Sequence, residues 1–295
     1  MLVRFAILLA AVFILPVAGR GDELIARGEY LSRAAGCQSC HTADGPNAVP
    51  FAGGRKLATP KGVFYGPNIT PDSEHGIGQW TEAEFLRALR RGIRRDGAHL
   101  YPVFPYTSYT KIADDDARAI FAYLKSLPAS STPNKAHELP FPYNIRTAMA
   151  VWKWLNFKPG AFAPVPNAQP ALNRGAYLVE ALGHCGECHT KRDWFGAIVP
   201  AMAFAGTKDG PDGKVVPNIT PDPETGIGAW SAKDLVYFLD TGLLPDGDST
   251  GGLMAEVIRN GTGKLADEDR QAIAIYLQSL RPITHKPKKD SPKAP

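Results

Sequence analysis

Apolar residues recur at helical spacing along this chain, and the segments that carry them come in matching pairs. The opening pair is marked by Leu24, Ile25, Tyr30 and Leu31 in one copy and by Tyr177, Leu178 and Leu182 in the other. The closing pair is predicted over 114–127 and 267–280, where acidic residues in the first turn complement the positive end of the helix dipole. The pattern therefore predicts two similar helical units in one chain.

A middle helix is expected in each unit, beginning at Thr81 and at Ser231, because both residues are good N-caps. Glu84 completes a capping box with Thr81. Gly36 and Gly183 end the opening helices, as glycine commonly does. Since no stretch shows sustained strand alternation, we predict an all-α fold with long loops rich in glycine and proline.

The loops between these helices repeat as well. The segment 67–72 recurs as 217–222, and the segment 76–80 recurs in closely similar form as 226–230. Similarity over so many segments in the same order indicates a duplicated domain, since each copy can bury its own core.

The repeat predicts two tandem domains, which we place over 20–128 and 171–283. A proline-rich linker over 129–170 joins them and contains an apolar segment, 145–157, that predicts a short helix. This helix either packs between the domains or offers a patch to a partner protein or a membrane surface. The lysine- and proline-rich tail, 284–295, is predicted to be disordered.

Two copies of the pentapeptide Cys-x-x-Cys-His contain all four cysteines of the chain. The motif residues are Cys37, Cys40 and His41 in the first copy and Cys185, Cys188 and His189 in the second. Two thiols at this spacing can each form a thioether to a haem vinyl group, and the histidine that follows then ligates the iron. A zinc site or a dithiol redox pair is the alternative, but zinc ribbons place their pairs only about 15–20 residues apart. We therefore predict two covalently bound haem c groups.

The first residues fit an export signal, which we place over 1–19. Arg4 supplies the positive start, an apolar run follows, and Ala18 and Gly19 offer a small-residue cleavage point. An uncleaved N-terminal anchor is the alternative. Because bacterial haem c is attached outside the cytoplasmic membrane, we expect a periplasmic protein, either soluble or peripheral on the periplasmic face of the inner membrane. The formal net charge of +4 is too weak to imply a nucleic-acid partner.

A family resemblance emerges from these motifs, the repeated Pro-Asn-Ile-Thr-Pro-Asp and Gly-Ile-Gly-x-Trp blocks, and the Leu-Tyr-Pro-Val-Phe-Pro-Tyr loop at 100–106. The chain resembles the multihaem cytochrome c subunits of bacterial membrane-associated alcohol and aldehyde dehydrogenases, and related dihaem cytochromes c. The resemblance implies tandem mono-haem domains that relay electrons from a dehydrogenase partner to quinone or another acceptor of the respiratory chain. No later segment is long or apolar enough to span a bilayer, so we expect the mature protein to be soluble or peripherally associated with the membrane.

The chain departs from that family in two places. The alcohol dehydrogenase subunits carry three haem domains, whereas two haem motifs occur here. Those subunits also commonly have methionine in the 100–106 loop where this chain has Phe104.

His41 and His189 are the proximal iron ligands by their place in the motifs. The resemblance makes the carbonyls of Pro67 and Pro217 candidate acceptors for the other ring nitrogen of each histidine. Met254 is predicted as the distal ligand of the second haem, because it lies between the middle and last helices, where such domains usually supply methionine.

The distal ligand of the first haem stays open. The loop that should supply it has Phe104, and Ile112 lies further on. His99 lies in this loop and could ligate the iron; otherwise the iron is vacant or water-ligated. Met149 lies after the last helix of the first domain, in the linker, and is expected to pack against other apolar residues.

These residues are compatible with two different functions. A haem with histidine and methionine ligands has no open position, so it can only exchange electrons through its edge. An open first haem could instead act as an enzyme on peroxide or a sulfur compound. The distal loop, 100–105, offers few groups for general acid–base chemistry. We therefore favour an electron-transfer protein that is not an enzyme by itself.

Overall fold

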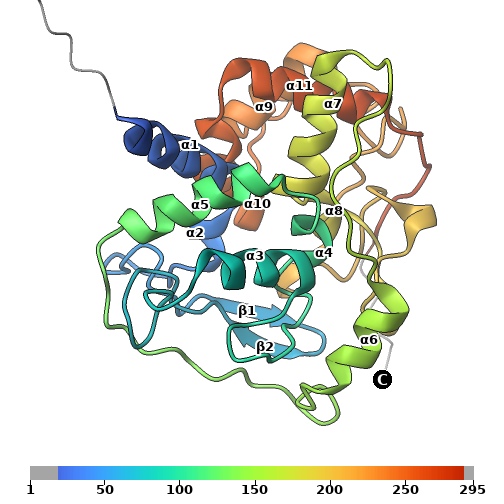
Figure 1. The fold of residues 1–295 in the computed structure, drawn as a ribbon. Helices are drawn as coiled ribbons and strands as arrows, with labels where there is room; N and C mark the ends of the chain where they lie inside the picture. The colour runs from blue at the N-terminus through green and yellow to red at the C-terminus, as the bar shows by residue number, and fades with distance from the viewer. Residues whose placement is uncertain (1–18, 289–295) are drawn as a thin grey trace, which may run out of the picture.

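Helices make up most of the regular structure (Figure 1). The computed structural model describes residues 19–288, so the predicted export signal over 1–19 lies outside the described residues except for Gly19. No helix within 19–288 is long and apolar enough to cross a membrane.

The first half of the chain, from α1 to α5, and the second half, from α7 to α11, contain corresponding helices, and α6 lies between them. In the first half these are α1 (Arg20–Ala34), α2 (Cys37–Cys40), α3 (Glu82–Arg91), α4 (Tyr106–Tyr109) and α5 (Asp114–Ser126). In the second half they are α7 (Pro170–Tyr177) with its continuation η1 (Leu178–Leu182), α8 (Cys185–His189), α9 (Ala232–Thr241), α10 (Gly252–Asn260) and α11 (Asp267–Ser279). The connecting segments are α6 (Ala148–Asn156) and the short turns η2 (Pro200–Met202), η3 (Pro211–Gly213) and η4 (Thr262–Lys264).

Local sequence signals set the ends of the longer helices. The capping box predicted at Thr81 is present, and Ser231 forms a second one with Asp234. Both closing helices begin where predicted and end one residue earlier. The apolar linker segment forms α6, as expected. The periodicity of apolar residues in the sequence did not predict α4 or α10.

The all-α prediction needs one correction, because the first half contains a β-hairpin. Strand β1 (Lys56–Thr59) pairs with the antiparallel strand β2 (Gly62–Tyr65). Each strand has four residues, too few to show a sustained alternation of apolar and polar positions. The backbone of Val63 also pairs with that of Glu138, so the linker continues along the hairpin.

Glycine allows the opening and closing helices of each half to cross at close range. A Cβ atom on Gly28 in α1 would lie 1.9 Å from the carbonyl oxygen of Ala119 in α5. A Cβ atom on Gly175 in α7 would lie 1.9 Å from the carbonyl oxygen of Ala272 in α11. Both distances are far shorter than any non-bonded contact of a real Cβ atom. Any residue larger than glycine would therefore force the two helices apart.

Two tyrosines join the halves through one reciprocal contact. The Tyr177 hydroxyl donates to Asp116 Oδ2 at 2.6 Å and accepts from the Ala113 N–H at 3.0 Å. Tyr30, in the first half, does the same in the second half: its hydroxyl donates to Asp269 Oδ2 at 2.6 Å and accepts from the Ala266 N–H at 3.0 Å.

These contacts complete the N-termini of α5 and α11. Ala113 and Ala266 are the N-cap residues and have no side chain that can cap. Asp116 and Asp269 are the third helical residues, which in a capping box would bond the N-cap N–H directly. Here a tyrosine hydroxyl from the other half lies between the carboxylate and that N–H.

An arginine from the same half completes each cluster. Arg27 pairs with Asp116, and Arg174 donates to both carboxylate oxygens of Asp269 at 2.7 and 2.6 Å. Although burial opposes it, hydrogen bonds from Arg174 and Tyr30 hold the pKa of Asp269 below its usual value. Both carboxylates are buried and each is paired with an arginine, the condition under which a buried acidic side chain is tolerated.

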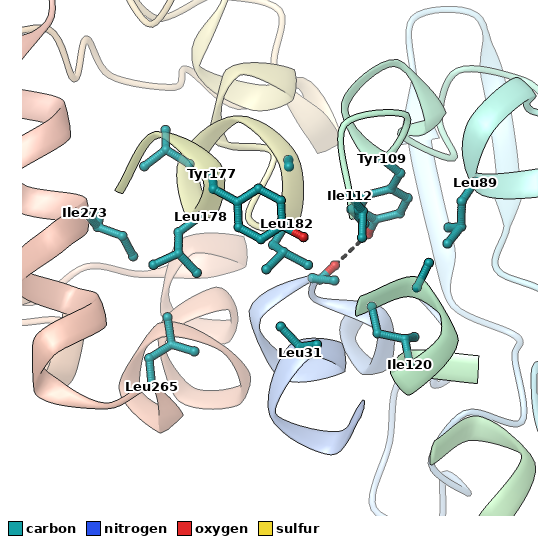
Figure 2. Packing of buried hydrophobic residues seen from close by; sticks show 14 of the residues in the cluster. Leu31, Leu89, Tyr109, Ile112, Ile120, Tyr177, Leu178, Leu182, Leu265 and Ile273 are labelled. Carbon is teal, nitrogen blue, oxygen red and sulfur yellow. Dashed lines mark hydrogen bonds between the residues drawn. The ribbon is translucent and has the colours of Figure 1, made fainter. Parts of the chain in front are cut away.

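A single buried apolar cluster extends through both halves (Figure 2). In Figure 2, Leu182 and Leu31 lie between Ile112 and Ile120 of the first half on one side and Leu265 and Ile273 of the second half on the other. Leu182 is completely buried. The halves thus share a core in addition to their polar contacts.

The segment after α11 is held more firmly than predicted. Thr284 donates to Asp222 Oδ2 at 2.7 Å, and the His285 N–H donates to Thr225 Oγ1 at 3.0 Å. The start of the tail, predicted to be disordered from 284, is therefore fixed to the second half by hydrogen bonds. Residues 289–295 of that tail lie outside the described residues.

We expect Tyr177→Phe to lower the free energy of unfolding by about 1–3 kcal/mol, because buried Asp116 and the Ala113 N–H each lose a hydrogen-bond partner. Urea unfolding of the holoprotein measures the change. Tyr65→Phe is the control, because its hydroxyl donates to Glu138 at the surface and its loss should change stability by only about 0.5 kcal/mol or less. An effect at Tyr177 no larger than the control would contradict the role of the reciprocal contact.

Candidate functional site

Each Cys-x-x-Cys-His motif lies on a single helical turn. In α2 and in α8 the two thiols are three positions apart, so they share one face of the turn. Left-handed residues precede both turns: Gly36 has φ 64° and His184 has φ 39°. Glycine adopts this conformation without strain, whereas His184 does so at some cost.

The motif histidines have the same hydrogen bond in both halves. His41 Nδ1 lies 2.7 Å from the Pro67 carbonyl oxygen, and His189 Nδ1 lies 2.8 Å from that of Pro217. A carbonyl can only accept, so Nδ1 carries the proton and Nε2 keeps its lone pair for a metal. Burial lowers the pKa of both rings, which favours the neutral imidazole that ligation requires. The acceptors suggested by the resemblance are present.

Buried asparagines hold the two proline carbonyls in place. The Asn68 side chain donates to the carbonyls of Ser130 and Thr132, and Asn218 donates to that of Ile283 at 2.7 Å. These hydrogen bonds fasten each Pro-Asn-Ile-Thr segment to the chain that follows the closing helix.

The four thiols form no disulfide with one another, and all four cysteines are half-buried. Burial raises the pKa of Cys37 to about 12, of Cys40 to about 11 and of Cys185 to about 12, and it also raises that of Cys188. Two protonated thiols on one face, followed by an imidazole with a free Nε2, form the donor set that a covalently attached haem needs. Within 19–288, no three His, Cys, Asp or Glu side chains gather where they could bind a metal ion.

The three described methionines outside the export segment differ in their surroundings. Met254 is half-buried in the first turn of α10, a helix that lies against α2 of the first half. Met149 packs beside Trp152 and Tyr106, which confirms the packing role expected for it. Met202 lies in η2 and is half-buried.

The segment that was expected to supply the distal side of the first haem, 99–112, runs through α4. Phe104 contacts Tyr109 edge-on with ring centroids 5.5 Å apart, and Ile112 is buried. His99 Nδ1 is buried and has no hydrogen-bond partner in the described protein. Burial and the nearby charge of Lys153 lower the pKa of His99, so its ring is neutral.

The two attachment motifs adjoin each other across the interface between the halves. The Tyr109 hydroxyl donates to the carbonyl oxygen of Ala35, just before the first motif, at 2.6 Å (Figure 2). The same ring meets that of His184, just before the second motif, with centroids 5.4 Å apart. Cys40 and Cys188 are close enough for a charge on the second thiol to raise the pKa of the first.

Polar residues at this junction were not identified from the sequence. Glu187, inside the second motif, accepts hydrogen bonds from Thr107 Oγ1 at 2.6 Å and from Ser108 Oγ at 2.8 Å. The only sequence signal was an acidic residue between two cysteines, and nothing local indicates its partners.

Comparison with known proteins agrees with this geometry. Residues 25–128 match the cytochrome c family model. The chain is 44% identical over 261 residues to a dihaem cytochrome c-type protein of Cereibacter sphaeroides, covering 87% of this chain and 86% of that protein.

Subunits of dehydrogenases are also similar. Identity is 41% with the fructose dehydrogenase cytochrome subunit of Gluconobacter japonicus and 39% with the cytochrome c subunit of a quinone alcohol dehydrogenase of Gluconobacter oxydans. The alignments cover 87% and 88% of this chain but only 52% and 55% of those subunits, so the chain spans about half of their length. The chain belongs to the dihaem cytochromes c and carries two covalently bound haem c groups.

Proposed function

We propose that this protein is exported and transfers electrons from a dehydrogenase partner to the respiratory chain. The observation that carries the proposal is the junction of the two attachment motifs, which adjoin across a shared buried core. Relatives that are cytochrome subunits of fructose and alcohol dehydrogenases support the same function. Each haem, when bound, accepts and releases one electron.

We assign one haem to each of two tandem domains, 20–128 and 171–283, joined by the linker 129–170. Support comes from the corresponding helices and from the paired glycine contacts at Gly28 and Gly175. The linker has its own contacts: Lys153 of α6 donates to the carbonyls of Arg91 and Gly92 at the end of α3. It would therefore fix α3 while connecting the domains.

The residues that would hold the haems follow from the donor set. Cys37 and Cys40 would attach the first haem, and Cys185 and Cys188 the second; His41 and His189 would each offer Nε2 to the iron. Met254 would be the distal ligand of the second iron, and its thioether would raise the potential there. The distal position of the first iron would be vacant or filled by His99.

We place the protein in the periplasm, where it would meet a dehydrogenase subunit and a quinone or other terminal acceptor. It would associate peripherally with the membrane. Aromatic side chains gather at one corner, where the Trp152 Nε1–H donates to the Phe195 carbonyl at 2.9 Å. Trp154 and Trp194 are each 82% exposed. Exposed aromatic groups of this size mark surfaces that meet a partner.

The second candidate function is an enzyme that acts on peroxide or a sulfur compound at an open first haem. Phe104 and Ile112 in place of a methionine favour it. The apolar character of 100–105 weighs against it, because proton transfer needs a positioned acid or base.

Rapid mixing separates the two functions. The reduced holoprotein is mixed with a quinone analogue in one experiment and with hydrogen peroxide in another. An electron-transfer protein reoxidises both haems with the quinone analogue and does not turn over peroxide. Sustained peroxide turnover at saturating reductant would favour the enzyme.

We expect mass spectrometry of the denatured protein to show the polypeptide plus two haem masses, because each motif offers two thiols for thioether bonds. Cys185→Ala with Cys188→Ala should leave one haem mass. A haem that acid acetone extracts from the unaltered protein would contradict covalent attachment.

We expect Met254→Leu to abolish the sulfur-to-iron charge-transfer absorption and to lower one potential only, because a thioether ligand stabilises reduced iron. Visible spectroscopy and a redox titration measure both effects. Met149→Leu is the control, since Met149 packs in an apolar cluster. Survival of the absorption in Met254→Leu would transfer the assignment to Met202 or Met149.

The ligand of the first iron is tested by electron paramagnetic resonance (EPR) of the wild type and of His99→Ala. We expect a high-spin signal in both, because Phe104 and Ile112 offer no donor and Arg146 holds the His99 carbonyl at 3.1 Å. A wild type without high-spin signal that becomes high-spin in His99→Ala would establish His99 as the ligand.

A further inference from the structure

Each half fastens the distal segment of its own haem to the attachment motif of the other half. In the first half the segment is α4, and it contacts Glu187 in the second motif. In the second half it is α10, which carries Met254, and Asn260 Nδ2 at its end lies 3.4 Å from Ser39 Oγ in the first motif. Ser39 and Glu187 both stand directly before the second cysteine of their motifs.

The two fastenings differ greatly in strength. Asn260 and Ser39 are neutral and share one long hydrogen bond. Glu187 is a carboxylate that accepts from two hydroxyls at 2.6 and 2.8 Å and pairs with Arg192. Its side chain is only 7% exposed. Hydrogen bonds to a buried charge are the stronger kind and are costly to lose.

The contact reaches the distal region of the first haem through α4. Thr107 and Ser108, which bind Glu187, lie in the same helical turn as Tyr109. Tyr109 packs edge-on against Phe104, which lies just before α4. The Tyr106 N–H also donates to the Phe104 carbonyl at 2.7 Å. A movement of α4 would therefore move Phe104.

We propose that Glu187 is a positioning residue for the first haem: from within the second attachment motif it fixes the segment that covers the distal side of the first iron. The inference rests on the proposed function, because it uses the distal assignment of 99–112. It makes the iron environment of one haem depend on the fold of the other half. Electrostatic interaction between the two haems alone would not produce this dependence.

The test is the double variant Thr107→Val with Ser108→Ala, which removes both donors and leaves the Glu187–Arg192 pair and all charges in place. We expect an altered ferric EPR signal of the first haem and a rise of about tenfold in its cyanide affinity, because α4 loses two bonds to a buried charge. The charge-transfer absorption assigned to Met254 should persist. Thr107→Ser, which keeps the hydroxyl, should behave as the wild type.

Tyr30→Phe is the matched control, because it removes another hydrogen bond between the halves without touching α4. It should lower stability and leave the EPR signal of the first haem unchanged. If it alters that signal as much as the double variant does, general loosening is the cause and the proposal is wrong. An unchanged first haem in the double variant also overturns it.

Ser108→Ala alone covers the case in which the double variant does not fold. It keeps the Thr107 bond, so it should shift the first haem in the same direction by a smaller amount, and no shift would overturn the proposal. Glu187→Gln keeps an oxygen acceptor but makes both bonds neutral, so it should shift the first haem's EPR signal in the same direction as the double variant by a smaller amount. A wild type that binds two haems but transfers no electrons would defeat the proposed function and leave this test valid.

Discussion

The tyrosine hydroxyl inserted between a carboxylate and a helix N-cap is the contact on which the assembly of this protein depends. Each such hydroxyl satisfies two buried polar groups of the opposite half at once. Without it, an aspartate would be short of a donor and an N-cap N–H would lack an acceptor at the start of a long helix. The contact fixes where α5 and α11 begin relative to α7 and α1. That placement in turn brings the two attachment motifs together around Tyr109.

Local sequence signals predicted much of this fold. Thr81, Ser231 and the acidic first turns of the closing helices located helix starts correctly, because caps act within a few residues. The motif histidines and their proline acceptors were also found, the acceptors through family resemblance. All of these features are either contiguous in sequence or carried by a recognisable block.

The remainder depends on contacts between residues far apart in the chain. The hairpin is too short to have a period, and its register is set in part by Glu138 from the linker. Nothing near Asn68 in the sequence reveals that the carbonyls of Ser130 and Thr132 come to lie beside it. Glu187 has no local signal for the same reason. Periodicity identifies which face of an element is buried, but it does not identify what lies opposite.

The reciprocity of the two tyrosines also bears on the origin of the chain. A two-fold axis between identical subunits creates reciprocal contacts: residue i of one subunit meets residue j of the other, and j of the first meets i of the second. Tyr30 with Asp269 and Tyr177 with Asp116 keep that form within one polypeptide. A duplicated unit that pairs with a copy of itself would leave this contact within one polypeptide. The two halves keep the contact although they differ beside it: Met254 lies in α10, whereas Phe104 lies just before the corresponding helix α4.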